Sequence, residues 1–106
     1  MARALVTVPA QVRRGEVFEV RTLVAHPMET GHRVDGQGGT VPRQIITRFT
    51  CRLDGRTVFA ADLHAAVAAN PYLAFYLRAT ASGTLSFTWE GDARFSHTET
   101  VALRVT

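Results

Sequence analysis

The chain has 106 residues, 46% of them apolar and 20% charged, which is the balance of a folded globular domain rather than of a disordered segment. This length predicts one domain over residues 1–106, with a single modest core and no room for a deep, enclosed catalytic cleft. The twelve basic side chains are all Arg, but only Arg13 and Arg14 are adjacent, and the formal net charge is +3. Because nucleic-acid-binding surfaces show a basic stripe interleaved with aromatic residues, we expect no nucleic-acid partner.

The N-terminal segment and the single Cys bear on the compartment in which the chain works. The first residues contain no apolar run of signal-peptide length, and no stretch elsewhere is long enough to span a membrane. Cys51 has no second Cys with which to form an internal disulfide. From the residues alone, we expect no membrane partner and a location either in the cytoplasm or in a compartment reached with another protein's export signal.

Short β-rich runs, separated by turn signals about every 8 to 12 residues, predict an all-β sandwich of about seven strands. Asp54-Gly55 is the sequence of a two-residue turn that needs positive φ, so it predicts an antiparallel hairpin between the third and fourth strands. Alternation in the third strand places Phe49, Cys51 and Leu53 on its core face. The predicted strands are Ala4–Val8, Val17–Ala25, Gln44–Leu53, Thr57–Ala61, Tyr72–Thr80, Thr84–Glu90 and Phe95–Val105.

Two segments depart from the strand pattern. The first, from His26 to Arg43, is a long Gly-rich connection with a flexible centre at Asp35–Gly39, and connections of this length are usually functional or mobile. The second, from Asp62 to Pro71, is Ala-rich and could form one or two helical turns before Asn70 and Pro71 end them.

The residues that could carry chemistry do not show the spacing of a known site. The four His, at positions 26, 32, 64 and 97, include no H-x-H pair of the kind that binds copper or zinc on a β-sandwich, so we expect no metal and no cofactor. His97 and Glu99 share a strand face, where they either pair or mark an edge strand that faces water. Cys51 is the one candidate nucleophile, but its place on an apolar strand face favours a structural role with a raised thiol pKa.

A surface for binding another protein has better support. The strand that begins after Asn70 is apolar or aromatic on both faces, with Tyr72, Ala74 and Tyr76 on the side that would otherwise meet water. A strand that is apolar on both sides has to be covered on both sides, and Tyr is an enriched interface anchor. Two interpretations stay open: either a partner covers this side, or the Ala-rich segment folds back over it.

Several motifs together resemble the SoxZ family, the small subunit of a sulfur-oxidation carrier complex. The resemblance runs nearly end to end, and the sequences HPMETG and ANPYL are its most specific parts. The matching segments are Val12–Leu23, His26–Gly31, Pro42–Arg43, Ile45–Ile46, Phe49–Cys51, Ala69–Leu73, Arg78–Leu85 and Phe87–Trp89.

This resemblance implies an immunoglobulin-like β-sandwich that pairs with a second subunit, SoxY, in a periplasmic heterodimer. In that family, a Cys near the C-terminus of SoxY carries thiosulfate-derived sulfur from one Sox enzyme to the next. The present chain has no Gly-rich terminal arm and no terminal Cys, so the carrier thiol is expected on the partner. Export together with a partner that carries the signal peptide is also expected.

The family defines no catalytic residues that can be transferred to this chain, so we expect a non-catalytic subunit that binds SoxY and makes transient contacts with other Sox enzymes. The isolated chain could form homo-oligomers through its bare surface. The alternatives are a sulfur-handling enzyme or metalloprotein that uses Cys51 with a nearby His, and a stand-alone module for small ligands. The candidate interface residues are Asn70, Tyr72, Ala74 and Tyr76, with His26, Met28 and Glu29 in the HPMETG segment.

Overall fold

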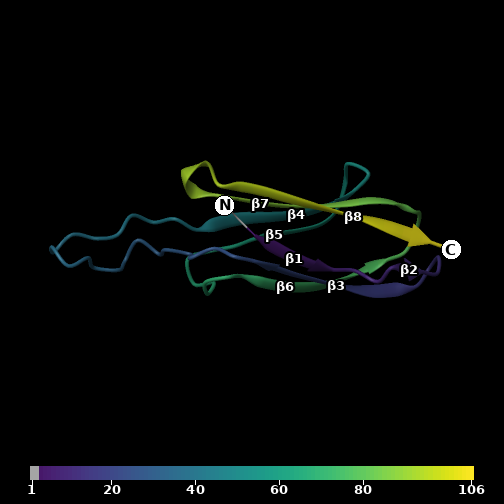
Figure 1. Ribbon diagram of the computed structural model, residues 1–106, viewed down its shortest axis with the longest axis horizontal. Helices are drawn as coiled ribbons and strands as arrows, with labels where there is room; N and C mark the ends of the chain where they lie inside the picture. Colours follow the sequence, from purple (N-terminus) through teal and green to yellow (C-terminus); the bar gives the residue numbers. More distant parts are fainter. Residues whose placement is uncertain (1–2) are drawn as a thin grey trace.

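In the computed structural model, which describes residues 3–106, the chain folds as a sandwich of two β-sheets (Figure 1). The first sheet has three strands in the order β1-β3-β6, and the second has five in the order β2-β8-β7-β4-β5. All neighbours are antiparallel except β2 and β8. The elements are β1 (Ala4–Thr7), β2 (Gln11–Val12), β3 (Val17–Val24), β4 (Ile46–Leu53), β5 (Arg56–Asp62), β6 (Tyr72–Arg78), β7 (Gly83–Gly91), the 3-10 turn η1 (Asp92–Arg94) and β8 (Ser96–Val105).

The predicted all-β sandwich is confirmed, and so is the hairpin at Asp54-Gly55. Both turn residues have positive φ, 48° at Asp54 and 85° at Gly55, as a two-residue turn between antiparallel strands requires. The Asp54 carboxylate also accepts a hydrogen bond from the backbone N–H of Thr84 at 2.9 Å. The turn that joins β4 to β5 is therefore tied to the start of β7 on the other side of β4.

The core lies between the two sheets and is built from the inward side chains of both. Phe49 of β4 is at its centre, with ring centroids 5.2 Å from Trp89 and 5.8 Å from Phe75 across the sandwich. Phe59 and Phe75 stack at 4.1 Å and close the side between β5 and β6. Aromatic pairs at such separations contribute about 0.5–1.5 kcal/mol beyond the burial of their area, so this cluster holds the two sheets together.

The structure differs from the sequence-based prediction at two elements. It adds β2, which has only two residues and pairs in parallel with the end of β8. The Ala-rich segment forms no helix: it makes a single turn, in which the N–H of Val67 donates to the carbonyl of His64 at 3.0 Å. Ala65 and Val67 are packed against the core, and this tertiary contact overrides the helical propensity of a short Ala run.

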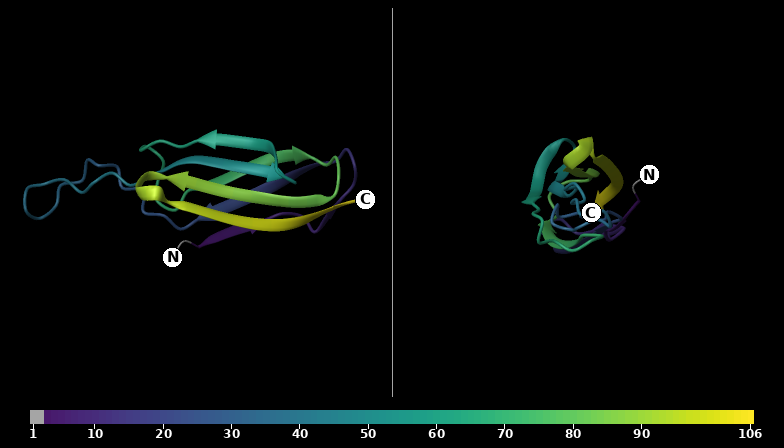
Figure 2. Two further views of the ribbon diagram at one scale, coloured as in Figure 1. Left: turned by 90° about the horizontal axis from the view of Figure 1, so that it is seen from above. Right: turned by 90° about the vertical axis from the view of Figure 1, so that its left-hand side faces the viewer.

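The connection between β3 and β4 projects from one end of the sandwich as a long hairpin, which we call the arm (residues 27–44). Figure 1 and the left view of Figure 2 show it standing clear of both sheets, at the end opposite the last residue of β8. The arm gives the molecule its elongated extents of 59 × 20 × 19 Å. Among residues 3–106, no helix has the length and apolar character needed to cross a membrane.

Candidate interaction surfaces

The two motifs that are most specific in the sequence, HPMETG and ANPYL, meet at the root of the arm. The backbone N–H of His26 donates to the side-chain Oδ1 of Asn70 at 3.0 Å, and the N–H of Asn70 donates to the carbonyl of His26 at 2.7 Å. Asn70 adopts a positive φ of 54°, a conformation in which Asn is less strained than most residues. The two motifs are therefore parts of one structural unit, which their separation in the sequence did not indicate.

His26 itself is buried rather than solvated, with 4% of its surface exposed. Its Nδ1 accepts a hydrogen bond from the N–H of Met28 at 3.0 Å, and its ring contacts Phe95 edge-on at a centroid distance of 4.8 Å. Burial lowers the pKa of His26, and the nearby Asp92 partly opposes this change. The imidazole therefore acts as a neutral acceptor that fixes the first turn of the arm.

The other predicted residues of the HPMETG segment are also occupied within the chain. Met28 is buried, and its Sδ accepts a hydrogen bond from the N–H of Ile46 at 3.2 Å. The Glu29 carboxylate binds the guanidinium of Arg33 through two nitrogens, at 2.6 and 2.9 Å. These side chains shape the arm root from within, and His26 and Met28 present little surface to a partner in the isolated chain.

The second leg of the arm is held by an ion pair that the sequence analysis did not identify. Arg43 binds both oxygens of the Asp92 carboxylate at 2.8 Å, and Asp92 Oδ2 also accepts the N–H of Ile45 at 3.2 Å. These donors lower the pKa of Asp92 below its usual value, with the Arg43 hydrogen bonds as the largest cause. Because 49 residues separate Arg43 from Asp92, no local sequence pattern could have predicted this contact.

Tyr72, Ala74 and Tyr76 lie together on the outer side of β6, and the Ala-rich segment does not cover them. Tyr72 is 58% exposed and Tyr76 is 65% exposed. The Ala-rich segment packs against the core instead of folding back over this strand. The interpretation in which that segment covers Tyr72 and Tyr76 is therefore wrong. In the isolated chain this side of β6 is bare.

Strand pairing extends this bare surface across the width of the three-stranded sheet at its arm end, beside the outward ion pair of Arg21 with Glu19. Leu5 of β1 is paired with Leu23 of β3, and Leu23 with Tyr72 of β6, so the three side chains form one row. Leu5 is 70% exposed and Leu23 is 38% exposed. We call the outer side of this sheet the apolar face; its apolar members are Leu5, Val17, Leu23, Tyr72, Ala74 and Tyr76.

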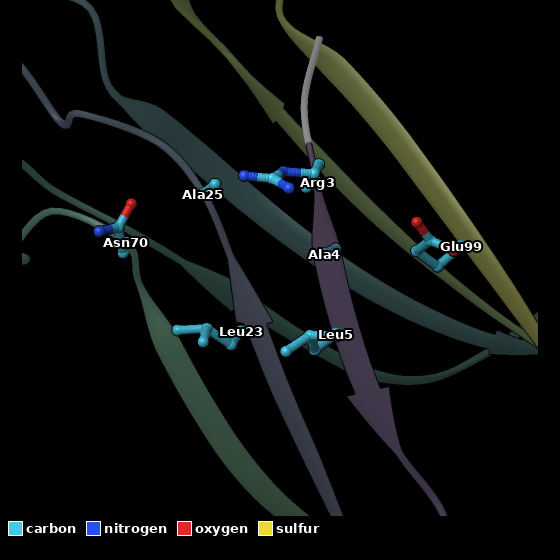
Figure 3. Close-up of a pocket in the computed structure, with 7 residues that line it drawn as sticks. All are labelled: Arg3, Ala4, Leu5, Leu23, Ala25, Asn70 and Glu99. Carbon is cyan, nitrogen blue, oxygen red and sulfur yellow. The ribbon is translucent and has the colours of Figure 1, made fainter.

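A groove with a volume of about 490 Å³ lies at the arm end of the apolar face (Figure 3). Leu5 and Leu23 lie side by side on adjacent strands, with Arg3 above them and Asn70 to one side. Glu99 of β8 lines the opposite side and pairs with His97 at 2.8 Å, so the hydrogen-bonded interpretation of these two residues is confirmed. The groove joins the apolar face to Asn70 of the ANPYL motif.

The alternative chemistry at Cys51 has no support in the geometry. Cys51 is fully buried in the core, and this burial raises the pKa of its thiol to about 12. A thiol in this state is protonated at neutral pH and cannot be reached by a substrate, so it is a poor nucleophile. Among residues 3–106, no group of three or more His, Cys, Asp or Glu side chains is arranged to hold a metal ion.

With this arrangement established, comparison with known families gives a clear result. The sequence model described as "Sulphur oxidation protein SoxZ" matches residues 6–102. The chain belongs to the SoxZ family. This assigns it to the proteins of the Sox sulfur-oxidation system. No curated protein sequence matches the chain.

Solved structures with the same fold include a sulfur carrier protein and superoxide reductases. The sulfur carrier protein SoxY from Chlorobium limicola f thiosulfatophilum superposes with a TM-score of 0.66 at 13% identity, over 97% of this chain and 78% of that chain. The superoxide reductase (neelaredoxin) from Ignicoccus hospitalis has a TM-score of 0.72 at 16% identity, over 97% and 80%. A putative superoxide reductase from Thermotoga maritima has a TM-score of 0.69 at 15% identity, over 97% and 85%. At these identities the likeness shows a shared immunoglobulin-like fold alone, and it carries no conclusion about activity.

Proposed function

We propose that this SoxZ-family chain is the non-catalytic subunit of a periplasmic sulfur carrier, and that it binds SoxY through the apolar face. The observation that carries the proposal is the row of Leu5, Leu23 and Tyr72, which leaves a contiguous apolar surface open to water on a chain of this size. Surfaces of this kind on small soluble proteins mark interfaces, and Tyr is enriched at their centres.

The division of labour follows from the state of the one thiol in the chain. Covalent transport of sulfur needs an accessible thiolate, and Cys51 is buried with a raised pKa. The carrier Cys of the complex is accordingly assigned to SoxY, and this chain supplies a docking surface. Export to the periplasm in the company of SoxY belongs to the same proposal.

The proposal is tested with the double substitution Tyr72→Ala/Tyr76→Ala, measured as the affinity of the purified chain for its SoxY partner by isothermal titration calorimetry. We expect the affinity to fall by at least about 30-fold, since truncation of interface anchors commonly costs 2 kcal/mol or more. The matched control is Thr98→Ala/Thr100→Ala on the outer side of the other sheet, which should change affinity less than about twofold. An unchanged affinity in the Tyr variant would exclude the apolar face as the SoxY site.

A further inference from the structure

The end of the sandwich opposite the arm is formed by three turns and by the last residues of β8, and we call it the basic pole (residues 13–16, 52–56, 78–84 and 104–106). Hydrogen bonds of the backbone and of one side chain join these segments into one surface. The N–H of Gly15 donates to the carbonyl of Ala79 at 2.8 Å, and the N–H of Val105 donates to Ser82 Oγ at 2.8 Å. In Figure 1 the basic pole is the end marked C, at the far end of the long axis from the arm.

Charge is distributed very unevenly between this pole and the rest of the molecule. The pole carries six Arg against two carboxylates, an excess of four positive charges, whereas the whole chain has a net charge of only +3. Outside the pole, six Arg face seven carboxylates. The charged side chains of the pole are Arg13, Arg14, Arg52, Arg56, Arg78, Arg104, Glu16 and Asp54.

The two pole carboxylates are engaged by backbone groups rather than by Arg side chains. Glu16 accepts the N–H of Arg13 at 2.9 Å, and Asp54 accepts the N–H of Thr84 at 2.9 Å. The ion pairs found among residues 3–106 all lie outside the pole, at Arg21–Glu19, Arg33–Glu29, Arg43–Asp92, Arg48–Asp62 and His97–Glu99. The pole therefore presents guanidinium groups without carboxylate partners in the described part of the chain.

Membership of the SoxZ family does not by itself give the basic pole a role. The guanidinium groups of the pole indicate the kind of ligand that it would bind. Guanidinium groups bind carboxylates through two parallel hydrogen bonds, and a cluster of them attracts an acidic surface over roughly 8–10 Å at moderate ionic strength. The turns of the pole contain no aromatic residue on which a base could stack. Their one large apolar side chain, Leu53, is buried in the core and is not free to enter a membrane. These features favour an acidic protein partner over a nucleic acid or a lipid surface.

We propose that the basic pole is a second docking surface, which attracts an acidic patch on the enzymes that load or unload the sulfur carrier. This inference rests on the proposed carrier function. The centres of the two docking surfaces lie at opposite ends of the sandwich, because the row of Leu5, Leu23 and Tyr72 is at the arm end of its sheet. The strand β6 reaches the pole only at Arg78. The apolar face gives a lasting contact with SoxY, and the pole gives a fast, salt-sensitive contact with enzymes that have to leave again.

The first experiment maps the pole directly on the full chain. Poly-L-glutamate is titrated into isotopically labelled protein, and amide shifts are followed by NMR. We expect shifts at residues 13–16, 54–56 and 104–106, and a loss of at least about tenfold in affinity between roughly 20 mM and 0.5 M salt. Shifts spread equally over the arm end, or binding that does not respond to salt, would overturn the proposal. Tighter binding of duplex DNA or phosphatidylglycerol vesicles than of the acidic peptide would overturn the assignment to a protein partner.

The second experiment uses the complex with SoxY and a purified Sox enzyme that transfers sulfur to it. Arg13→Gln/Arg14→Gln and Arg56→Gln/Arg104→Gln should each slow association with the enzyme about three- to tenfold at low salt. The control Arg94→Gln removes an exposed Arg at the arm end and should leave the rate unchanged. The affinity for SoxY should stay the same in all three variants. If the SoxY complex forms normally but the pole variants associate at the control rate, the basic pole is excluded and the proposed function stands.

Discussion

The outer faces of the two sheets carry very different side chains. On the three-stranded sheet, Leu5, Leu23 and Tyr72 form an exposed apolar row. On the five-stranded sheet, the corresponding cross-strand rows are polar: Thr88 pairs with Thr98, and their hydroxyls lie 3.1 Å apart. A Thr side chain suits a strand that faces water, because it favours the β conformation and its hydroxyl can be hydrated. An exposed Leu or Tyr contributes stabilising free energy only when its apolar surface becomes buried. The five-stranded sheet thus presents polar rows to water, and under the proposed function the apolar row is the surface that SoxY covers.

The strongest test of this comparison places one Asp on each face. Leu23→Asp should lower the affinity for SoxY by at least about 100-fold, because it removes the burial of a Leu and forces a charge into the interface. Thr100→Asp, on the outer side of β8, should change the affinity less than about twofold. Affinity is measured by calorimetry, and circular dichroism checks that each variant is folded. Equal losses in the two variants would show that the faces do not differ in the way proposed.

Self-association of the isolated chain gives a second, smaller test. Without its partner the apolar face is bare, so we expect the chain to form homodimers at high concentration. Leu5→Asp should weaken this self-association about tenfold in sedimentation velocity, since Leu5 is 70% exposed and its replacement costs the fold little. Thr100→Asp serves again as the control. A homodimer that survives Leu5→Asp unchanged would place the self-contact somewhere other than the apolar face.

Much of the fold could be predicted because its information is local. Alternation placed Phe49, Cys51 and Leu53 in the core, and Asp54-Gly55 specified a turn that two residues determine by themselves. The two-residue strand β2 was missed because Gln11 and Val12 are too few to show a period. The Ala-rich segment was wrongly expected to contain helical turns because propensity carries no information about the core that Ala65 and Val67 join.

The candidate interface could be predicted only in part, for a related reason. Tyr72 and Tyr76 stood out because their strand is apolar on both sides, which is visible in a single segment. Leu5 and Leu23 did not, since each becomes significant only when strand pairing sets them in a row with Tyr72. The contact between Arg43 and Asp92 likewise depends on the route of the chain. Register and long-range contact are consequences of folding, and no local window of sequence contains them.

The smallest expected effect concerns the root of the arm, where the apolar face ends at Asn70. Burial lowers the pKa of His26 below its ordinary value of 6.5, so the unfolded chain binds a proton more readily than the folded chain does. Stability from this group is therefore fully present above about pH 6.5 and is lost as the pH falls below that value. Protonation also turns Nδ1 from the acceptor of the Met28 N–H into a donor, which breaks that hydrogen bond.

Chemical denaturation of the wild-type chain between pH 7.5 and pH 5.5 (roughly one unit to either side of the ordinary His pKa) should accordingly show a decrease in the free energy of unfolding. His26→Gln should flatten this decrease, because Gln can accept the Met28 N–H through its side-chain oxygen but does not titrate. Asp92 does not contribute to this decrease, because the pKa of its carboxyl is lowered. The stability that Asp92 provides is lost only as the pH falls below its ordinary pKa of 3.8. His32→Gln is the matched control, because His32 is exposed on the arm. If His32→Gln flattened the profile and His26→Gln did not, the buried imidazole would not be the group that holds the first turn of the arm through the Met28 N–H.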